Sequence, residues 1–162
     1  MKEQKEEIVT VRLAVKGDLR WIKRVNESCL SENYDERLYI NFFYNYPGLV
    51  WVAEHKKKII GYIMVELRGL KIMRAHIWSI AVMSKFRGHG IGTNLMNVVE
   101  TQLVDVHNIQ FITLHVRQSN IRGLRLYAST MKYNVKQSIP EYYDDKESAV
   151  YMVKYFVKTH DK

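Results

Sequence analysis

The chain has 162 residues, of which 47% are hydrophobic, and this composition suits one compact domain with an apolar core. No apolar run approaches the ~18 residues of a membrane-spanning helix, and residues 1–7 lack the apolar segment of a secretory signal, so we expect a cytoplasmic protein that has no membrane partner. The net charge of +8 suits a polyanionic ligand, such as nucleic acid, an acidic surface or a phosphorylated cofactor. The single cysteine, Cys29, excludes an internal disulfide, and its apolar surroundings predict a buried structural thiol rather than a nucleophile.

Hydrophobic periodicity and turn residues predict a mixed α/β chain. Asp18 and Asn120 stand where their side chains can cap helices, and Lys56-Lys57-Lys58 reads as a solvated hairpin turn. The β-α-β crossover in the middle predicts two parallel strands within an otherwise antiparallel order. Residues 68–74 form a weakly patterned connection. The expected elements, in chain order, are a strand at 8–15, helices at 19–30 and 36–45, strands at 49–54, 59–67 and 75–82, a helix at 91–106, a strand at 109–116, a helix at 121–131, and strands at 133–139 and 149–157.

The segment Arg87-Gly88-His89-Gly90-Ile91-Gly92-Thr93 is the most informative stretch of the sequence. It joins a predicted strand to a predicted helix, and its glycines remove side chains where backbone must approach a ligand. Backbone N–H groups at a helix N-terminus suit a pyrophosphate. A tight turn without a ligand is the competing interpretation. The segment is not a Walker A loop, and its glycines are wrongly spaced for a dinucleotide fingerprint.

Arg87-x-x-Gly90-x-Gly92 resembles the Arg/Gln-x-x-Gly-x-Gly/Ala signature of GNAT acetyltransferases. Four further segments resemble the catalytic subunit of the NatA N-terminal acetyltransferase and its archaeal homologues: residues 30–34 (LSENY), 76–82 (HIWSIAV), 114–120 (LHVRQSN) and 141–143 (EYY). The resemblance implies a GNAT fold, with a mixed, mostly antiparallel sheet of about seven strands whose central parallel pair splays at the cofactor, flanked by about four helices. We expect one domain over 1–162, with its core at about 8–157.

The resemblance also implies roles for individual residues. Acetyl-CoA would be bound by Ile80, Ala81, Val82, Arg87, Gly88, His89, Gly90, Ile91, Gly92, Thr93, Asn120 and Tyr127, with the Val82 N–H near the thioester carbonyl and Tyr127 near the sulfur. The peptide would be bound by Glu32, Asn33, Tyr34, His76, His115, Tyr142 and Tyr143. Catalytic roles would fall to His76, His115, Tyr127 and Glu32.

Three features depart from the family pattern. The usual Tyr-Tyr-x-Asp-Gly-Glu-Asp-Ala stands here as residues 142–149 (YYDDKESA), so Lys146 replaces the glycine. Trp78 occupies a position usually held by a smaller residue and could narrow the site. The segment between Val65 and His76 is short.

The chemistry of an N-terminal amine favours a weak base. An α-amino group has a pKa of about 7.7–8.0, against about 10.4 for lysine, so a histidine acting through water suffices. Strand alternation puts His115 on the face of Phe111 and Thr113, and His76 on the face of Trp78, Ile80 and Val82. Either histidine could instead be a hydrogen-bonded core residue, Glu32 is an alternative base, and Tyr127 without the resemblance reads as core.

We therefore expect a protein N-terminal acetyltransferase that works by direct attack in a ternary complex. The alternative is a GNAT enzyme acting on lysine side chains, a ribosomal protein or a small amine. A basic nucleic-acid-binding module is disfavoured, because the aromatic residues cluster in predicted helices and strands. The histidines show no close ligand spacing, so no metal site is expected. The sequence leaves open the preferred first residue, the choice of base, the oligomeric state, and association with the ribosome or an auxiliary subunit.

Overall fold

The computed structural model describes residues 8–69 and 73–156, and these form a seven-stranded sheet in the order β1-β2-β3-β4-β5-β7-β6. None of the helices in the described ranges is long and apolar enough to cross a membrane. The strands are β1 (Thr10–Leu13), β2 (Val50–His55), β3 (Lys58–Arg68), β4 (Arg74–Val82), β5 (Phe111–Arg117), β6 (Asn134–Ile139) and β7 (Ala149–Tyr155). The helices are α1 (Leu19–Cys29), α2 (Glu36–Asn45), α3 (Ile91–His107) and α4 (Ile121–Leu124), with short 3₁₀ turns η1 (Lys16–Asp18) and η2 (Ser84–Phe86) and a π-helical segment η3 (Arg125–Thr130).

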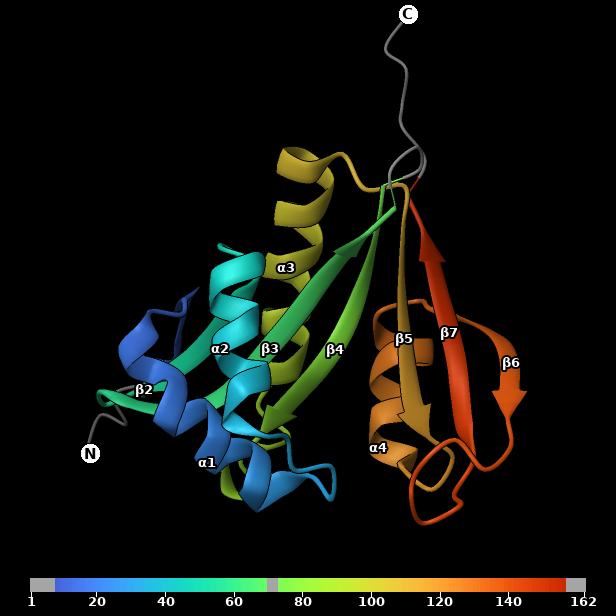
Figure 1. Cartoon of the computed structure of the whole chain (residues 1–162), viewed down its shortest axis with the longest axis horizontal. Helices are drawn as coiled ribbons and strands as arrows, with labels where there is room; N and C mark the ends of the chain where they lie inside the picture. The colour runs from blue at the N-terminus through green and yellow to red at the C-terminus, as the bar shows by residue number, and fades with distance from the viewer. Residues whose placement is uncertain (1–7, 70–72, 157–162) are drawn as a thin grey trace, which may run out of the picture.

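The sheet parts between β4 and β5, its parallel pair. Their pairing runs from Arg74 opposite Phe111 to Ile77 opposite Leu114 and then stops. Both strands continue, β4 to Val82 and β5 to Arg117, so their C-terminal ends diverge (Figure 1). The neighbouring pairs β3–β4 and β5–β7 are antiparallel. The predicted mixed sheet with a splayed central pair is confirmed.

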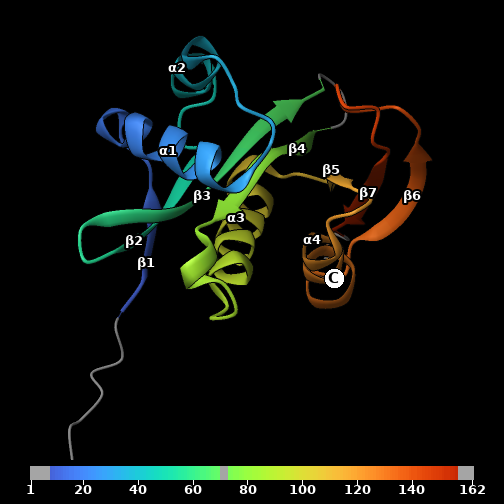
Figure 2. The ribbon, with the colours of Figure 1, turned by 90° about the horizontal axis from the view of Figure 1, so that it is seen from below.

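Helices cover both faces of the sheet. Figure 2 shows α1 and α2 on one face and α3 and α4 on the other. The α1–α2 side packs around Ile22, Phe42 and Tyr62, whereas the α3 side packs around Leu95, Leu103 and other aliphatic side chains. The apolar stripes that predicted α1 and α3 therefore face the sheet, as periodicity requires.

A β-bulge at Trp78 corrects the expected side-chain alternation of β4. Met64 of β3 lies opposite Ser79, but the next residue, Val65, lies opposite Ile77, which leaves Trp78 as an extra residue. His76, which precedes the bulge, and Trp78, the bulge residue, lie on the α1–α2 face of the sheet. After it, Ile80 and Val82 pack on the α3 face. The prediction that all four side chains share one face is wrong, because alternation assumes an unbroken ladder.

Two predicted caps have different outcomes. Asn120 caps α4, since its Oδ1 accepts the Gly123 N–H at 2.9 Å. Asp18 precedes α1 but makes no capping bond there. Its carboxylate instead accepts the Val15 N–H and the Arg12 guanidinium, because an ion pair to β1 competes for the same oxygens.

The remaining boundaries differ from expectation by a few residues. The lysine turn is confirmed as a two-residue hairpin turn, in which Lys56 and Lys57 both have positive φ (48° and 61°). The first strand is shorter than the expected 8–15, and η3 forms a π-helical continuation of the expected 121–131 helix. Residues 70–72 of the expected connection, and residue 157, lie outside the described residues.

Candidate active site

The glycine turn before α3 forms a site for an anion. Gly88 and Gly90 have φ of 82° and 73°, and a Cβ added at either would meet nothing within 4 Å. At both glycines the main chain therefore borders open space, with no side chain between it and a ligand. In the described part of the chain, no acceptor is found for the backbone N–H groups of residues 88–93. Unpaired donors at the positive end of a 17-residue helix suit a pyrophosphate.

The end of β4 turns backbone groups toward the gap in the sheet. Met83 N–H donates to the Ile60 carbonyl of β3 at 2.8 Å. Because antiparallel hydrogen bonding alternates along a strand, the N–H and C=O groups of Ile80 and Val82 point the other way, toward the side that β5 has left. The structure thus places at this gap the two residues whose backbone the sequence assigned to the acyl arm.

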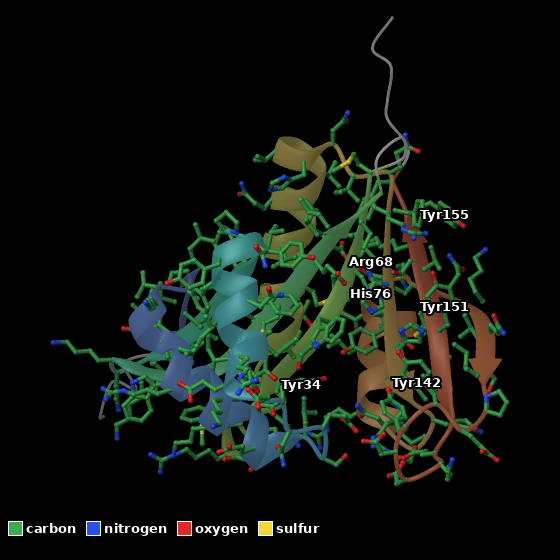
Figure 3. The ribbon with its side chains drawn as sticks, in the orientation of Figure 1. Tyr34, Arg68, His76, Tyr142, Tyr151 and Tyr155 are labelled. Atoms are coloured by element: carbon green, nitrogen blue, oxygen red, sulfur yellow. The ribbon has the colours of Figure 1, made fainter. Side chains whose placement is uncertain are left out.

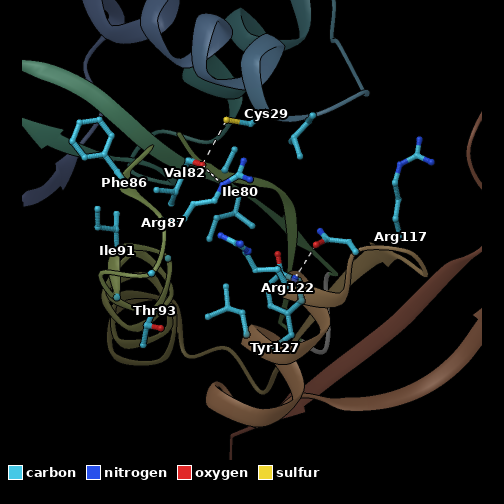
Figure 4. A pocket seen from close by; sticks show the side chains of 18 of the residues that line it. Cys29, Ile80, Val82, Phe86, Arg87, Ile91, Thr93, Arg117, Arg122 and Tyr127 are labelled. Atoms are coloured by element: carbon cyan, nitrogen blue, oxygen red, sulfur yellow. Dashed lines mark hydrogen bonds between the residues drawn. The ribbon is translucent and has the colours of Figure 1, made fainter. Parts of the chain in front are cut away.

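Arg87 and Cys29 both approach the Val82 carbonyl. Arg87 Nε donates to it at 2.8 Å, and Cys29 Sγ lies 3.6 Å from the same oxygen. Figure 4 shows Arg87, Ile80 and Val82 grouped at the centre of the pocket, with Cys29 above and Tyr127 below. Arg87 therefore braces the end of β4 as well as lining the pocket. The expected buried thiol is only partly buried and lines the pocket too.

These elements enclose a pocket of about 500 Å³, which we call the glycine-turn pocket. His89 is exposed and does not line it, and the His89 Nδ1 atom lies 3.3 Å from the Phe86 carbonyl. Arg122 and Cys29 line it without having been predicted. The predicted residues that do line it are Ile80, Ala81, Val82, Arg87, Gly88, Gly90, Ile91, Gly92, Thr93, Asn120 and Tyr127.

A second pocket, of about 630 Å³, opens beside the first on the side of the histidines. We call it the histidine pocket. Its lining includes every residue that was predicted to bind the peptide: Glu32, Asn33, Tyr34, His76, His115, Tyr142 and Tyr143. Seven residues line both pockets: Leu30, Ser31, Glu32, Ile80, Arg117, Asn120 and Tyr127. A ligand in one pocket can therefore meet a ligand in the other at the parting of β4 and β5.

The two histidines lie side by side, with ring centroids 5.2 Å apart. His76 Nδ1 is 2.7 Å from Thr113 Oγ1, and Thr113 Oγ1 is 3.4 Å from the Ala75 carbonyl. His115 shares its strand face with Thr113, as predicted, and stacks on Tyr142 at 4.6 Å. Burial, together with the positive charge of Arg68, lowers the pKa of His76 to about 3. The same two causes lower the pKa of His115. Both imidazoles are therefore neutral at cellular pH, and each has a ring nitrogen whose lone pair can accept a hydrogen bond.

The tyrosines around the pockets stay protonated. Burial raises the pKa of Tyr127, which is 7% exposed in the core below both pockets. Burial also raises the pKa of Tyr34 to about 12. Figure 3 shows Tyr34 on the α1–α2 side of the gap, and Tyr142 on the other side. The Tyr34 and Tyr127 phenols therefore stay protonated at neutral pH and can donate hydrogen bonds.

Glu32 is held in an ion pair. Arg117, at the end of β5, donates to its carboxylate and also to Asp145 and Glu147. The pairing fixes the Glu32 carboxylate at the edge of both pockets. No role was predicted for Arg117, although it stands inside the LHVRQSN segment.

Two further residues near the histidine pocket, Arg68 and Thr113, were not predicted from the sequence. Arg68 lines the pocket and is paired with Glu66 at 2.6 Å. Thr113 holds His76 but has no chemistry of its own that a sequence motif would single out. Among the described residues, no cluster of three or more His, Cys, Asp or Glu side chains is arranged to hold a metal ion.

The site fits coenzyme A on structural grounds. The bare glycine turn offers donors for a diphosphate, and the backbone of Ile80 and the N–H of Val82, which β5 does not pair, offer polar groups to a pantetheine arm. Arg122 has no carboxylate within 4.0 Å in the described ranges, so it is available to a phosphate. The neutral histidines lie beyond the point where the two pockets meet.

Comparison with known proteins defines the class. The sequence profile of the Acetyltransferase (GNAT) family matches residues 18–133. The chain belongs to this family of acetyltransferases, which confirms the resemblance seen in the sequence.

Relatives within the family are N-terminal acetyltransferases. The N-terminal acetyltransferase complex ARD1 subunit homolog of Dictyostelium discoideum is 36% identical over 91% of this chain and 73% of its own length. The N-alpha-acetyltransferase of Sulfolobus acidocaldarius is 31% identical over 88% of this chain and 89% of its own. The structure of Chaetomium thermophilum Naa20 in complex with a bisubstrate analogue superposes with a TM-score of 0.81 at 29% identity, over 90% of this chain and 86% of that one.

Proposed function

We propose that the protein transfers an acetyl group from acetyl-CoA to the free α-amino group of a peptide or protein N-terminus, by direct attack in a ternary complex. The observation that carries this function is the meeting of the two pockets at Ile80, Asn120 and Tyr127. One pocket ends on unpaired helix donors, and the other on two neutral imidazoles. Acetyl-CoA, when bound, supplies an acetyl group activated as a thioester.

The first pocket holds the cofactor. Backbone N–H groups of residues 88–93 bind its diphosphate, and Arg87 and Arg122 add positive charge. Val82 N–H points into the gap in the sheet and stabilises negative charge that develops on the acyl oxygen. Tyr127 lines both pockets and is protonated at neutral pH, so it would be the group that gives a proton to the departing sulfur.

The second pocket prepares the amine. A peptide N-terminus has a pKa of about 7.7–8.0, so part of it is neutral before binding. His76 or His115 accepts the remaining proton through water. Glu32, fixed by Arg117, orients the amine rather than taking its proton. A lysine amine would need about 3 kcal/mol more to deprotonate, from ~1.36 kcal/mol per pKa unit.

A partner face supports association with an auxiliary subunit. Val15, directly before η1, and Ile40 and Tyr44 on α2 are exposed, and Lys16 Nζ lies 3.3 Å from Tyr44 Oη. An apolar patch with a basic rim suits a protein partner, and the Dictyostelium relative is named as a subunit of a complex.

The charge of +8 also suits ribosomal RNA at the place where N-termini emerge. This setting implies a cytoplasmic enzyme.

The function is tested with peptides that begin with Met, Ser, Ala or Glu, each with a free or a blocked N-terminus. We expect mass spectrometry to find acetylation of free N-termini alone. Full activity on blocked peptides that contain lysine would instead establish the lysine-directed alternative. Calorimetry with coenzyme A gives an independent measure, and absence of binding would refute the assignment of the glycine-turn pocket.

A further inference from the structure

Arg117 lies where the glycine-turn pocket and the histidine pocket meet. It ends β5, three residues beyond the last pairing of β5 with β4, and it lines both pockets. Its side chain is only 17% exposed. A cation held at this point is either part of the reaction or part of the frame around it.

The contacts of Arg117 reach two loops that are far apart in the sequence. Its Nε donates to Glu32 of the α1–α2 loop at 2.7 Å. Its Nη2 also donates to Glu32, and its Nη1 donates to Asp145 at 2.8 Å and to Glu147 at 2.6 Å, both in the β6–β7 loop. The planar guanidinium can serve both loops at once, because its donors point in several fixed directions.

Arg117 is also linked by contacts to the tyrosines of the histidine pocket. The guanidinium carbon lies 4.0 Å from the centre of the Tyr143 ring, and Tyr143 meets Tyr142 edge-on at 5.0 Å. Tyr142 in turn stacks on His115 at 4.6 Å. Contacts therefore lead without interruption from Arg117 through the loop to an imidazole of the site.

The β6–β7 loop is strained where it turns. Lys146 has φ of 68°, in the left-handed region that favours glycine. Lys146 N–H donates to the Tyr143 carbonyl at 2.8 Å, and Tyr142 and Tyr143 N–H groups both donate to the Glu147 carbonyl. The turn that carries the two tyrosines thus depends on a conformation that its own sequence disfavours.

We propose that Arg117 is a positioning residue that joins the two loops into one wall of the peptide entrance and holds the β6–β7 loop in the strained turn at Lys146. It acts through Glu32, Tyr142 and Tyr143, and it takes no part in proton transfer. The inference rests on the proposed function, because it concerns binding of the peptide.

The test combines Arg117→Lys with three forms of residue 146. Arg117→Lys keeps the charge but cannot bridge both loops, so we expect the KM for the peptide to rise about tenfold, while kcat and the Kd for coenzyme A change less than about twofold. Lys146→Gly relaxes the turn, and in the Arg117→Lys background we expect it to recover about threefold of the lost KM. Lys146→Ala is the matched control, since it removes the lysine side chain and its 3.7 Å contact with Glu141 but keeps the strain.

Each outcome decides the proposal. Equal rescue by Ala and Gly would refute the role of the strained turn. A kcat that falls while KM stays constant would show that Arg117 acts on the reaction and overturn the positioning role. If Arg117→Lys lowers coenzyme A binding, and so disturbs more than the peptide entrance, the single variants decide: Lys146→Gly must give a lower peptide KM than Lys146→Ala. Failure of the unmodified enzyme to bind coenzyme A or to acetylate peptides would count against the proposed function instead.

Discussion

The glycine-turn pocket and the histidine pocket lie side by side but are built in different ways. The first takes most of its polar groups from two short stretches, residues 80–82 and 87–93, that follow each other along the chain. The second is assembled from the α1–α2 loop, β4, β5 and the β6–β7 loop. Local sequence therefore determines the first pocket, whereas tertiary contacts determine the second.

The two pockets also differ in the kind of polar group that each offers to its ligand. In the glycine-turn pocket the polar groups are main-chain donors, which any sequence with the right φ angles supplies. In the histidine pocket they are side chains whose protonation depends on burial and on neighbours such as Arg68. We expect the first to respond to backbone changes, and the second to pH and to side-chain substitutions.

The largest expected effect concerns stability against acid, and it belongs to the histidine pocket. His76 has a pKa of about 3 in the folded protein, against about 6.5 unfolded. Between these two pH values the unfolded chain binds a proton at this imidazole that the folded chain does not bind. The free energy of unfolding therefore decreases as pH falls from about 6.5 to 3, by on the order of 4 kcal/mol. Denaturant unfolding of wild type and His76→Gln at several pH values should show a flatter profile for the variant. Parallel profiles would contradict the buried neutral imidazole.

The next effect identifies the base. We expect His76→Gln to lower kcat about 100-fold or more, because a positioned base contributes on the order of 10²–10⁴, and to leave the Kd for coenzyme A unchanged. His115→Gln is the companion variant. A larger loss in His115→Gln than in His76→Gln would transfer the role of base to His115, and no loss in either would exclude both.

A backbone change should act on the other pocket alone. In Gly90→Val a β-branched residue would have to adopt φ of 73° at the start of α3. We expect binding of coenzyme A to weaken about 100-fold. Gly17→Val is the control, since Gly17 has open space around it and no positive φ. Calorimetry on both variants decides, and similar affinities would remove the glycine turn from the cofactor site.

The smallest effect tests the orientation of His76. Its Nδ1 lies 2.7 Å from Thr113 Oγ1, and a proton on Nδ1 leaves Nε2 free to act as base. Thr113→Val should lower kcat about tenfold, and Thr113→Ser should restore most of the rate. Imidazole ¹⁵N shifts would report the tautomer directly, and an unchanged tautomer in Thr113→Val would contradict this arrangement.

Much of the fold could be predicted, because periodicity and turn residues are local signals. The helix at Glu36–Asn45 and the cap at Asn120 follow from such signals. Asp18 did not cap its helix because Arg12, six residues away, offered a stronger partner. A cap can be inferred from neighbouring residues, whereas the outcome of that competition depends on the position of β1.

Sequence-based prediction worked best for the parts of the site whose residues are neighbours in the chain. The residues of the glycine turn line one pocket, apart from His89, and those assigned to the peptide line the other. Arg117 received no role, because its partners lie 28, 30 and 85 residues away. The replacement of a glycine by Lys146 was noticed, but only the φ angle shows what the glycine position requires.

The extra residue at Trp78 has a consequence for how this chain can tolerate change in length. Deleting Trp78 would restore a regular ladder, because Ile77 and Ser79 already lie opposite the consecutive residues Val65 and Met64. Ile80 and Val82 would keep their places on the α3 face. The bulge thus absorbs one residue of β4 without turning the side chains on either side of it, so this strand should tolerate the loss of Trp78 better than the loss of a paired residue.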